Sequence, residues 1–185
     1  MSEINFEDLL EAFEAGGECS PPLPDSDVSA LVAPESLRRL LRHAGEWHLT
    51  RDHCGVFGLN LFSAGGNGRR GPFFDKRAVF GDADLAAEWG EEHPVPNCGR
   101  EGWECFAVSS EYDYLFVCVD PETERFGETR RVTNNCDEDA AFTEAPFDHF
   151  LERVAEFAAA YRRYDPEEDE DEEGPPEFIP YFRGR

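Results

Sequence analysis

The chain has 185 residues, of which 41 are Asp or Glu and 17 are Lys or Arg, so its formal net charge is −24. A charge of this sign repels phosphates, and we therefore expect no nucleic-acid partner. Hydrophobic residues make up 40% of the chain and aromatic residues 13%, which is too much for a chain that is disordered throughout. The length suits one domain with a tail and excludes a large multidomain enzyme.

The sequence predicts a cytoplasmic protein that contacts no membrane. No stretch approaches the roughly 18 consecutive apolar residues of a membrane-spanning helix. Residues 1–5 are acidic where a signal peptide would be basic. The six cysteines are accordingly expected to be reduced thiols rather than a disulfide framework.

The acidity is not confined to the end of the chain. Residues 165–185 carry 9 acids and 2 bases, and eight of these acids lie between Asp165 and Glu173. Such a run cannot bury apolar area and repels itself, so we expect 165–185 to be a disordered acidic tail. Its aromatic end, 178–182, is either a docking peptide or a segment that packs back on the domain. Residues 1–164 still carry a net charge of −17.

Two helices are expected in the first quarter of the chain. Apolar residues at helical spacing predict an amphipathic helix that begins near Phe6 and is halted at Gly16-Gly17, with a linker that extends to residue 22. The next helix is predicted over 34–43, with its leucines inward and Gly45 as its stop.

The middle of the chain is predicted to be mainly strands. β-Branched and aromatic residues between turn residues predict strands over 55–62, 104–109, 112–119 and 129–134. A short helix is expected at 85–89. Turns are predicted at 111–113, inside a hairpin, and at 120–123, where the second strand of that hairpin ends.

A closing amphipathic helix is predicted over 146–164. Its apolar residues repeat at intervals of three and four. They are Phe147, Phe150, Leu151, Val154, Phe157, Ala158 and Tyr161. The order of elements predicts an α+β fold with N-terminal helices, a central, mostly antiparallel sheet and a C-terminal helix packed on it.

No motif in the chain predicts catalysis, a cofactor or a metal. The glycine-rich stretch 63–71 contains two arginines but lacks the Gly-Lys-Ser/Thr ending of a phosphate-binding loop, so we interpret it as a surface loop. Cys98 and Cys105 have six residues between them, whereas zinc-binding cysteine pairs usually have two to four. His53 and Cys54 would complete a set of four possible ligands, but a chain with six Cys and five His offers such sets by number alone. We therefore expect no zinc.

Several phrases of the sequence, taken together, point to a known family. Residues 34–45 form a helix that ends in glycine, and 103–120 contain a strand, a short polar turn, a second aromatic strand and an Asp. A further strand at 131–132 and the Phe-x-x-Phe-Leu phrase at 147–151 follow. In this order they resemble the SUKH superfamily, which includes bacterial immunity proteins, fungal cell-wall-synthesis regulators and related proteins of large DNA viruses.

The resemblance covers about residues 23–164 and implies an α+β binding domain that is not an enzyme. Many members neutralise toxins, often nucleases or deaminases, by covering their active sites. Our leading hypothesis is therefore an immunity or inhibitor protein that binds a basic toxin or effector through an acidic face. The alternative is a viral protein of the same fold that engages and counteracts host defence or cell-death proteins in the host cytoplasm or nucleus.

The binding face is predicted around the central hairpin. Alternate residues of a strand share a face, so two tyrosines in the hairpin are expected to project together, with acids at the turn beside them. Carboxylates there would meet Lys or Arg of the partner, and the aromatic rings would supply buried area. The predicted residues are Glu104, Glu111, Tyr112, Asp113, Tyr114 and Asp120.

Overall fold

The structure is a computed structural model, and it describes residues 6–7, 10–11, 18–49, 59–62, 72–75, 102–109, 113–133 and 145–163. The helix predicted at 85–89, the glycine-rich stretch and the acidic tail lie outside these ranges. Among the described segments, no helix is long and apolar enough to cross a membrane.

Within the described ranges, seven strands form one sheet, in which their order is their order along the chain. Every neighbouring pair is antiparallel. The strands are β1 (Glu18–Cys19), β2 (Trp47–Leu49), β3 (Leu59–Leu61), β4 (Trp103–Ser109), β5 (Asp113–Cys118), β6 (Glu128–Thr133) and β7 (Ala145–Pro146). The predicted hairpin is confirmed as the pairing of β4 with β5.

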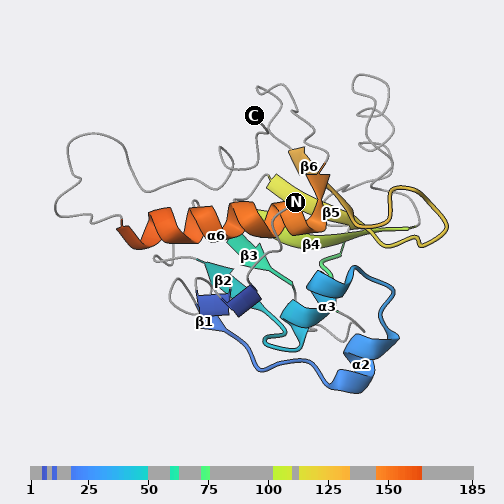
Figure 1. Ribbon diagram of the computed structural model, residues 1–185, viewed down its shortest axis with the longest axis horizontal. Helices are drawn as coiled ribbons and strands as arrows, with labels where there is room; N and C mark the ends of the chain where they lie inside the picture. The colour runs from blue at the N-terminus through green and yellow to red at the C-terminus, as the bar shows by residue number, and fades with distance from the viewer. Residues whose placement is uncertain are drawn as a thin grey trace.

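The helices are α2 (Asp25–Ala30), α3 (Glu35–Leu41) and α6 (Phe147–Arg163), and residues 6–7 and 10–11 are also helical. Figure 1 shows α6 lying along the sheet, with the two short helices α2 and α3 together at one end of the molecule. The arrangement of helices at both ends of the chain and a central antiparallel sheet confirms the predicted α+β class.

The main core lies between α6 and the sheet. Phe150 of α6 packs edge-on against Phe106 of β4 with 4.8 Å between ring centroids, and Phe147 does so at 5.2 Å. Edge-to-face pairs of this kind add stability beyond the area that the rings bury. Leu115 and Val117 of β5 belong to the same buried cluster. The apolar stripe of α6 is therefore confirmed as its packing face in its first two turns.

A second apolar cluster occupies the opposite face of the sheet. It contains Trp103 and Cys105 of β4 with Phe116 and Cys118 of β5, all buried, and Tyr114 packs against it. The alternation in β5 is strict, since Leu115 and Val117 face the main core. β5 is thus apolar on both faces, which explains the continuous hydrophobic run of this strand.

The helix predicted over 34–43 is present as α3, but it does not end at Gly45 as predicted. Leu37, Leu40 and Leu41 of α3 are fully buried, as predicted. The helix ends at Leu41, however, and Gly45 lies beyond it. A Cβ at Gly45 would lie 3.0 Å from the carbonyl oxygen of Pro21. Gly45 is needed for this close approach of two backbone segments.

Four short elements have no counterpart in the sequence prediction: β1, α2, β2 and β7. β1 lies in the linker that was predicted between Gly17 and residue 22, and it pairs with β2 at the edge of the sheet. α2 has six residues and Val28 is its buried side chain. Elements of two to six residues are too short to show a hydrophobic periodicity, and tertiary contacts determine whether they form.

Gly102 is expected to be the less replaceable of two glycines with positive φ. Gly102 has φ +88°, and an added Cβ would lie 2.9 Å from the Cβ of Asp120, whereas at Gly127, with φ +82°, it would lie 3.4 Å from Pro34. Gly102→Ala should therefore lower the free energy of unfolding by about 2 kcal/mol, and Gly127→Ala by about 1 kcal/mol. Urea unfolding of both variants measures the difference, and equal losses would contradict the steric argument.

Candidate functional site

The structure describes four of the six residues predicted for the binding face, and one of these in its backbone only. Glu111 and Tyr112 lie outside the described residues, and Asp113 is described as the first residue of β5 without its side chain. Glu104, Tyr114 and Asp120 are all half-buried. The prediction that Tyr112 and Tyr114 project together stays a prediction.

Glu104 and Tyr114 lie on opposite faces of the sheet. Glu104 is paired with Val117, whose side chain is in the main core, so Glu104 is on the α6 side. Tyr114 packs against the cluster on the other side. An irregularity in β4 between Cys105 and Ala107 shifts the register at this point. The two residues cannot belong to one flat binding face on this hairpin.

Tyr114 and Asp120 also have structural roles. Tyr114 packs beside Phe116 and Trp103, which is the commoner role of an aromatic residue in a strand. The Oδ1 atom of Asp120 accepts a hydrogen bond of 3.0 Å from the backbone N–H of Glu122. This bond stabilises the turn that follows β5.

The loop from β5 to β6 presents exposed acids close to the predicted face. Residues 119–127, which join the two strands, contain three acids and one base, which gives a net charge of −2. Glu122 and Glu124 are exposed, and neither carboxylate forms an ion pair with any residue that the structure describes. The sequence predicted a turn at 120–123 and Asp120 as a binding residue, but not that Glu122 and Glu124 would be exposed beside it.

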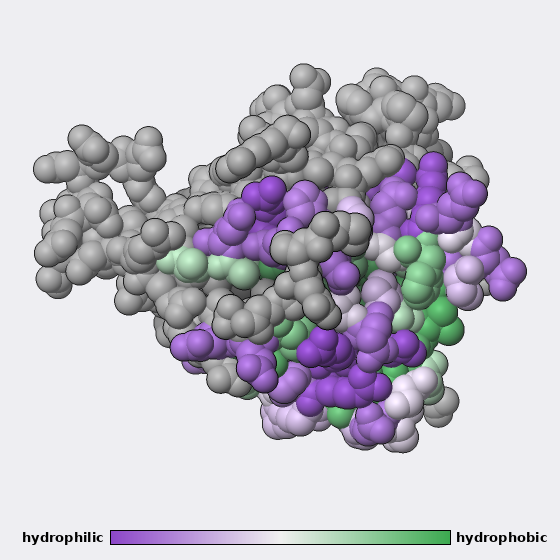
Figure 2. Space-filling model, in the orientation of Figure 1, coloured by the Kyte–Doolittle hydropathy of each residue, from purple (hydrophilic) through white to green (hydrophobic). Residues whose placement is uncertain are grey.

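Two hydrophobic side chains are exposed close to this loop. Among the described residues, the exposed large hydrophobics are Val32, at 54%, and Phe126, at 40%. Their segments meet, because an added Cβ at Gly127 would lie 3.4 Å from the Cγ of Pro34. Figure 2 shows a hydrophobic patch bordered by hydrophilic surface at the right of the molecule, where the β5–β6 loop meets the α2–α3 connection in Figure 1. We call Val32 and Phe126 the apolar patch.

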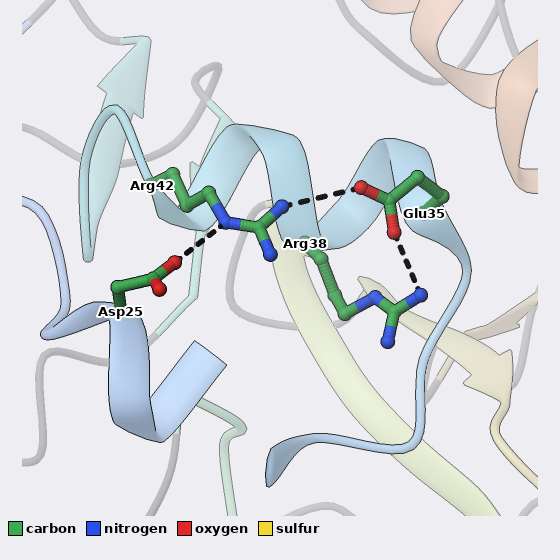
Figure 3. A network of polar contacts seen from close by, with 4 residues as sticks. All are labelled: Asp25, Glu35, Arg38 and Arg42. Atoms are coloured by element: carbon green, nitrogen blue, oxygen red, sulfur yellow. Dashed lines mark hydrogen bonds and ion pairs between the residues drawn. The ribbon is translucent and has the colours of Figure 1, made fainter. Parts of the chain in front are cut away.

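A polar network on the surface joins α2 to α3. Arg42 Nε donates a hydrogen bond of 3.0 Å to Asp25 Oδ1, and Arg42 Nη1 donates one of 3.2 Å to Glu35 Oε1 (Figure 3). Arg38 Nη2 lies 2.6 Å from the other carboxylate oxygen of Glu35. Two guanidinium groups and two carboxylates thus bind in a row, and the row fixes α2 against α3. Val32 lies in the connection between these helices.

The same network shifts two pKa values. Burial alone would raise the pKa of Glu35, but the positive charges and hydrogen bonds of Arg38 and Arg42 outweigh it and lower the pKa below its ordinary 4.5. The hydrogen bond to Asp25 is the largest cause that raises the pKa of Arg42. Both shifts favour the charged forms that the network requires.

The network is expected to lose its contribution in acid. A carboxylate with a lowered folded-state pKa stabilises the fold above its unfolded-state pKa, and this stability is lost as the pH falls through the folded-state value. Glu35→Gln should therefore lower the melting temperature at neutral pH, and this difference from wild type should shrink as the pH falls below the ordinary 4.5. Thermal unfolding of wild type and Glu35→Gln from neutral to acidic pH measures this difference in melting temperature. Glu18→Gln, at an exposed position, is the control variant. A difference that persists in acid would contradict the role of the charge.

Two of the three described cysteines are in positions that favour a structural role, whereas Cys19 is exposed. Cys105 and Cys118 are buried, and burial is the largest cause that raises the pKa of the Cys118 thiol. Cys98, Cys54 and His53 lie outside the described residues, and within the described ranges no group of three or more His, Cys, Asp or Glu side chains is placed to hold a metal ion.

No family model, curated protein or solved structure matches this chain. The resemblance to the SUKH superfamily therefore stays an expectation from the sequence.

Proposed function

We propose that this chain is a non-enzymatic, cytoplasmic protein-binding module, similar to SUKH immunity proteins, that neutralises a basic toxin or effector by covering it. The observation that carries the proposal is the β5–β6 loop with its exposed Glu122 and Glu124, which form no ion pair with any residue that the structure describes. A net charge of −24 over the chain adds a long-range attraction for a basic partner. We therefore propose the β5–β6 loop as the binding face, in place of the strands of the hairpin.

The charges of the loop are expected to act mainly on the rate of association. Exposed carboxylates at the edge of an interface steer the encounter, and salt screens their effect. They contribute little to the fold, so replacing them should leave its stability nearly unchanged. This separates a binding role from a structural one in the same variants.

The experiment starts with capture of the tagged full chain from native cells and identification of the bound protein. The association rate of the purified pair is then measured at low and high salt for wild type and for Glu122→Lys and Glu124→Lys. Each reversal should slow association several-fold at low salt, and the effect should vanish at high salt. Glu18→Lys, on β1 at the opposite edge of the sheet, makes the same change in net charge and should have a smaller effect.

The partner's identity and activity decide between the candidate roles. A basic toxin whose activity is lost in the complex supports the immunity role. A host defence or cell-death protein would support the viral alternative instead. Capture of no protein, or an association rate that does not depend on salt, would contradict the proposal.

A further inference from the structure

We propose that the apolar patch formed by Val32 and Phe126 is the anchor point for a partner segment in which apolar residues alternate with Lys or Arg. This inference rests on the proposed function and assigns the contact that decides how long the partner stays bound. An apolar side chain of the partner packs on Phe126, and its flanking cations lie against Glu122 and Glu124.

The β5–β6 loop holds Phe126 outward by a set of local hydrogen bonds. Phe126 N–H donates to the carbonyl oxygen of Thr123 (3.2 Å), and Gly127 N–H donates to that of Cys118 (2.9 Å). The hydroxyl oxygen of Thr123 accepts from the N–H of Arg125 at 2.9 Å. An exposed ring on a loop with this many bonds loses little further conformational entropy on binding. Phe126 is thus a pre-positioned anchor.

The other half of the patch is fixed as well. Val32 stands between α2 and α3, which Arg42 holds together through Asp25 and Glu35. Gly127 meets Pro34, and this contact brings the connection 31–34 against the loop. Two segments that are far apart in the sequence therefore lie against each other, and each presents one exposed apolar side chain. Interfaces concentrate their binding energy on central apolar anchors of this kind.

The negative charge of the β5–β6 loop determines which kind of segment can bind at the apolar patch. The loop, residues 119–127, carries a net charge of −2, and its exposed acids Glu122 and Glu124 precede Phe126 by four and two residues. The chain's own residues 165–185 carry 9 acids and 2 bases, and a second copy carries the same −24, so both are repelled. A segment of a basic protein is attracted instead. Its apolar residues match Val32 and Phe126, and its cations match Glu122 and Glu124.

The test uses the full chain and three short synthetic peptides whose binding is followed by fluorescence anisotropy. One peptide alternates Leu with Arg, one alternates Ser with Arg, and one alternates Leu with Glu. The Leu–Arg peptide should bind most tightly. Phe126→Ala leaves the net charge unchanged, so it should weaken the Leu–Arg peptide about tenfold or more and leave the Ser–Arg peptide unaffected.

Two further variants separate the apolar contact from a loss of structure. Phe126→Leu keeps an apolar side chain and should restore most of the affinity that Phe126→Ala loses. Val32→Ser should weaken the Leu–Arg peptide in the same direction, because it removes the other half of the patch. All three variants should keep the wild-type melting temperature within a few degrees, as exposed positions do.

Several results would overturn the inference. They are equal binding of the Leu–Arg peptide by wild type and Phe126→Ala, binding of a synthetic 165–185 peptide that depends on Phe126, and a concentration-dependent dimer that Phe126→Ala abolishes. The captured partner separates this inference from the proposed function. A partner that Phe126→Ala binds as well as wild type does would overturn the patch alone, whereas a wild-type chain that captures no partner would overturn the proposed function.

Discussion

Phe106→Ala is expected to lower the free energy of unfolding by about 4 kcal/mol and the melting temperature by roughly 10 °C. Phe106 is fully buried and lies at the centre of the aromatic cluster, with ring centroids 4.8 Å from Phe150 and 5.2 Å from Phe147. The substitution removes the ring's burial and leaves a cavity between the sheet and α6, which these neighbours fill only in part. Thermal and urea unfolding measure the loss.

The matched control is the same substitution at Phe126, which is 40% exposed. Phe126→Ala should change the free energy of unfolding by about 1 kcal/mol or less, because 40% of the surface of Phe126 already faces water and no closed cavity is left behind. Phe106→Leu should fall between the two, at about 1–2 kcal/mol, since it keeps part of the buried volume. Equal destabilisation by the two alanine variants would mean that the packing of α6 on β4 does not hold the fold together.

The closing helix and the central strands could be predicted because their patterns are long. Seven apolar residues at helical spacing predicted a helix over 146–164, and the structure places it over Phe147–Arg163. The continuous apolar run of β5 was sufficient to place a strand there, although it could not show that β5 is buried on both faces. That property depends on the two clusters that pack on either side of it.

The surface could be predicted only in part. The turn after β5 was identified from Asp120 and Pro121, but the exposure of Phe126 depends on the bonds that close the loop and on its contact with the α2–α3 connection. Val32 is far from Phe126 in the sequence, and no local pattern brings the two together. The opposite placement of Glu104 and Tyr114 likewise follows from a register shift in β4 that period-two alternation does not predict.

The second large effect is expected at Arg130 of β6. Arg130 pairs with Phe116 and so lies beside the second cluster, on the face of the sheet opposite α6. Its side chain is 6% exposed, its Nε lies 2.7 Å from Glu128 Oε1, and its guanidinium carbon lies 5.2 Å from the centre of the Trp103 ring. Arg130→Ala leaves the half-buried carboxylate of Glu128 without this cation and Trp103 without its stacked partner. We expect a loss of about 3 kcal/mol in the free energy of unfolding, because removing one member of a buried ion pair strands the other.

Two replacements of similar length show whether charge or packing causes the loss at Arg130. Arg130→Met keeps the stem that covers Trp103 but removes the charge, and it should still destabilise the fold because Glu128 stays unpaired. Adding Glu128→Gln to Arg130→Met should recover part of that loss, since no carboxylate is then left without its partner. Urea unfolding of the two single variants and the double variant measures this coupling directly. Additive losses in that cycle would show that Arg130 does not stabilise the fold through Glu128.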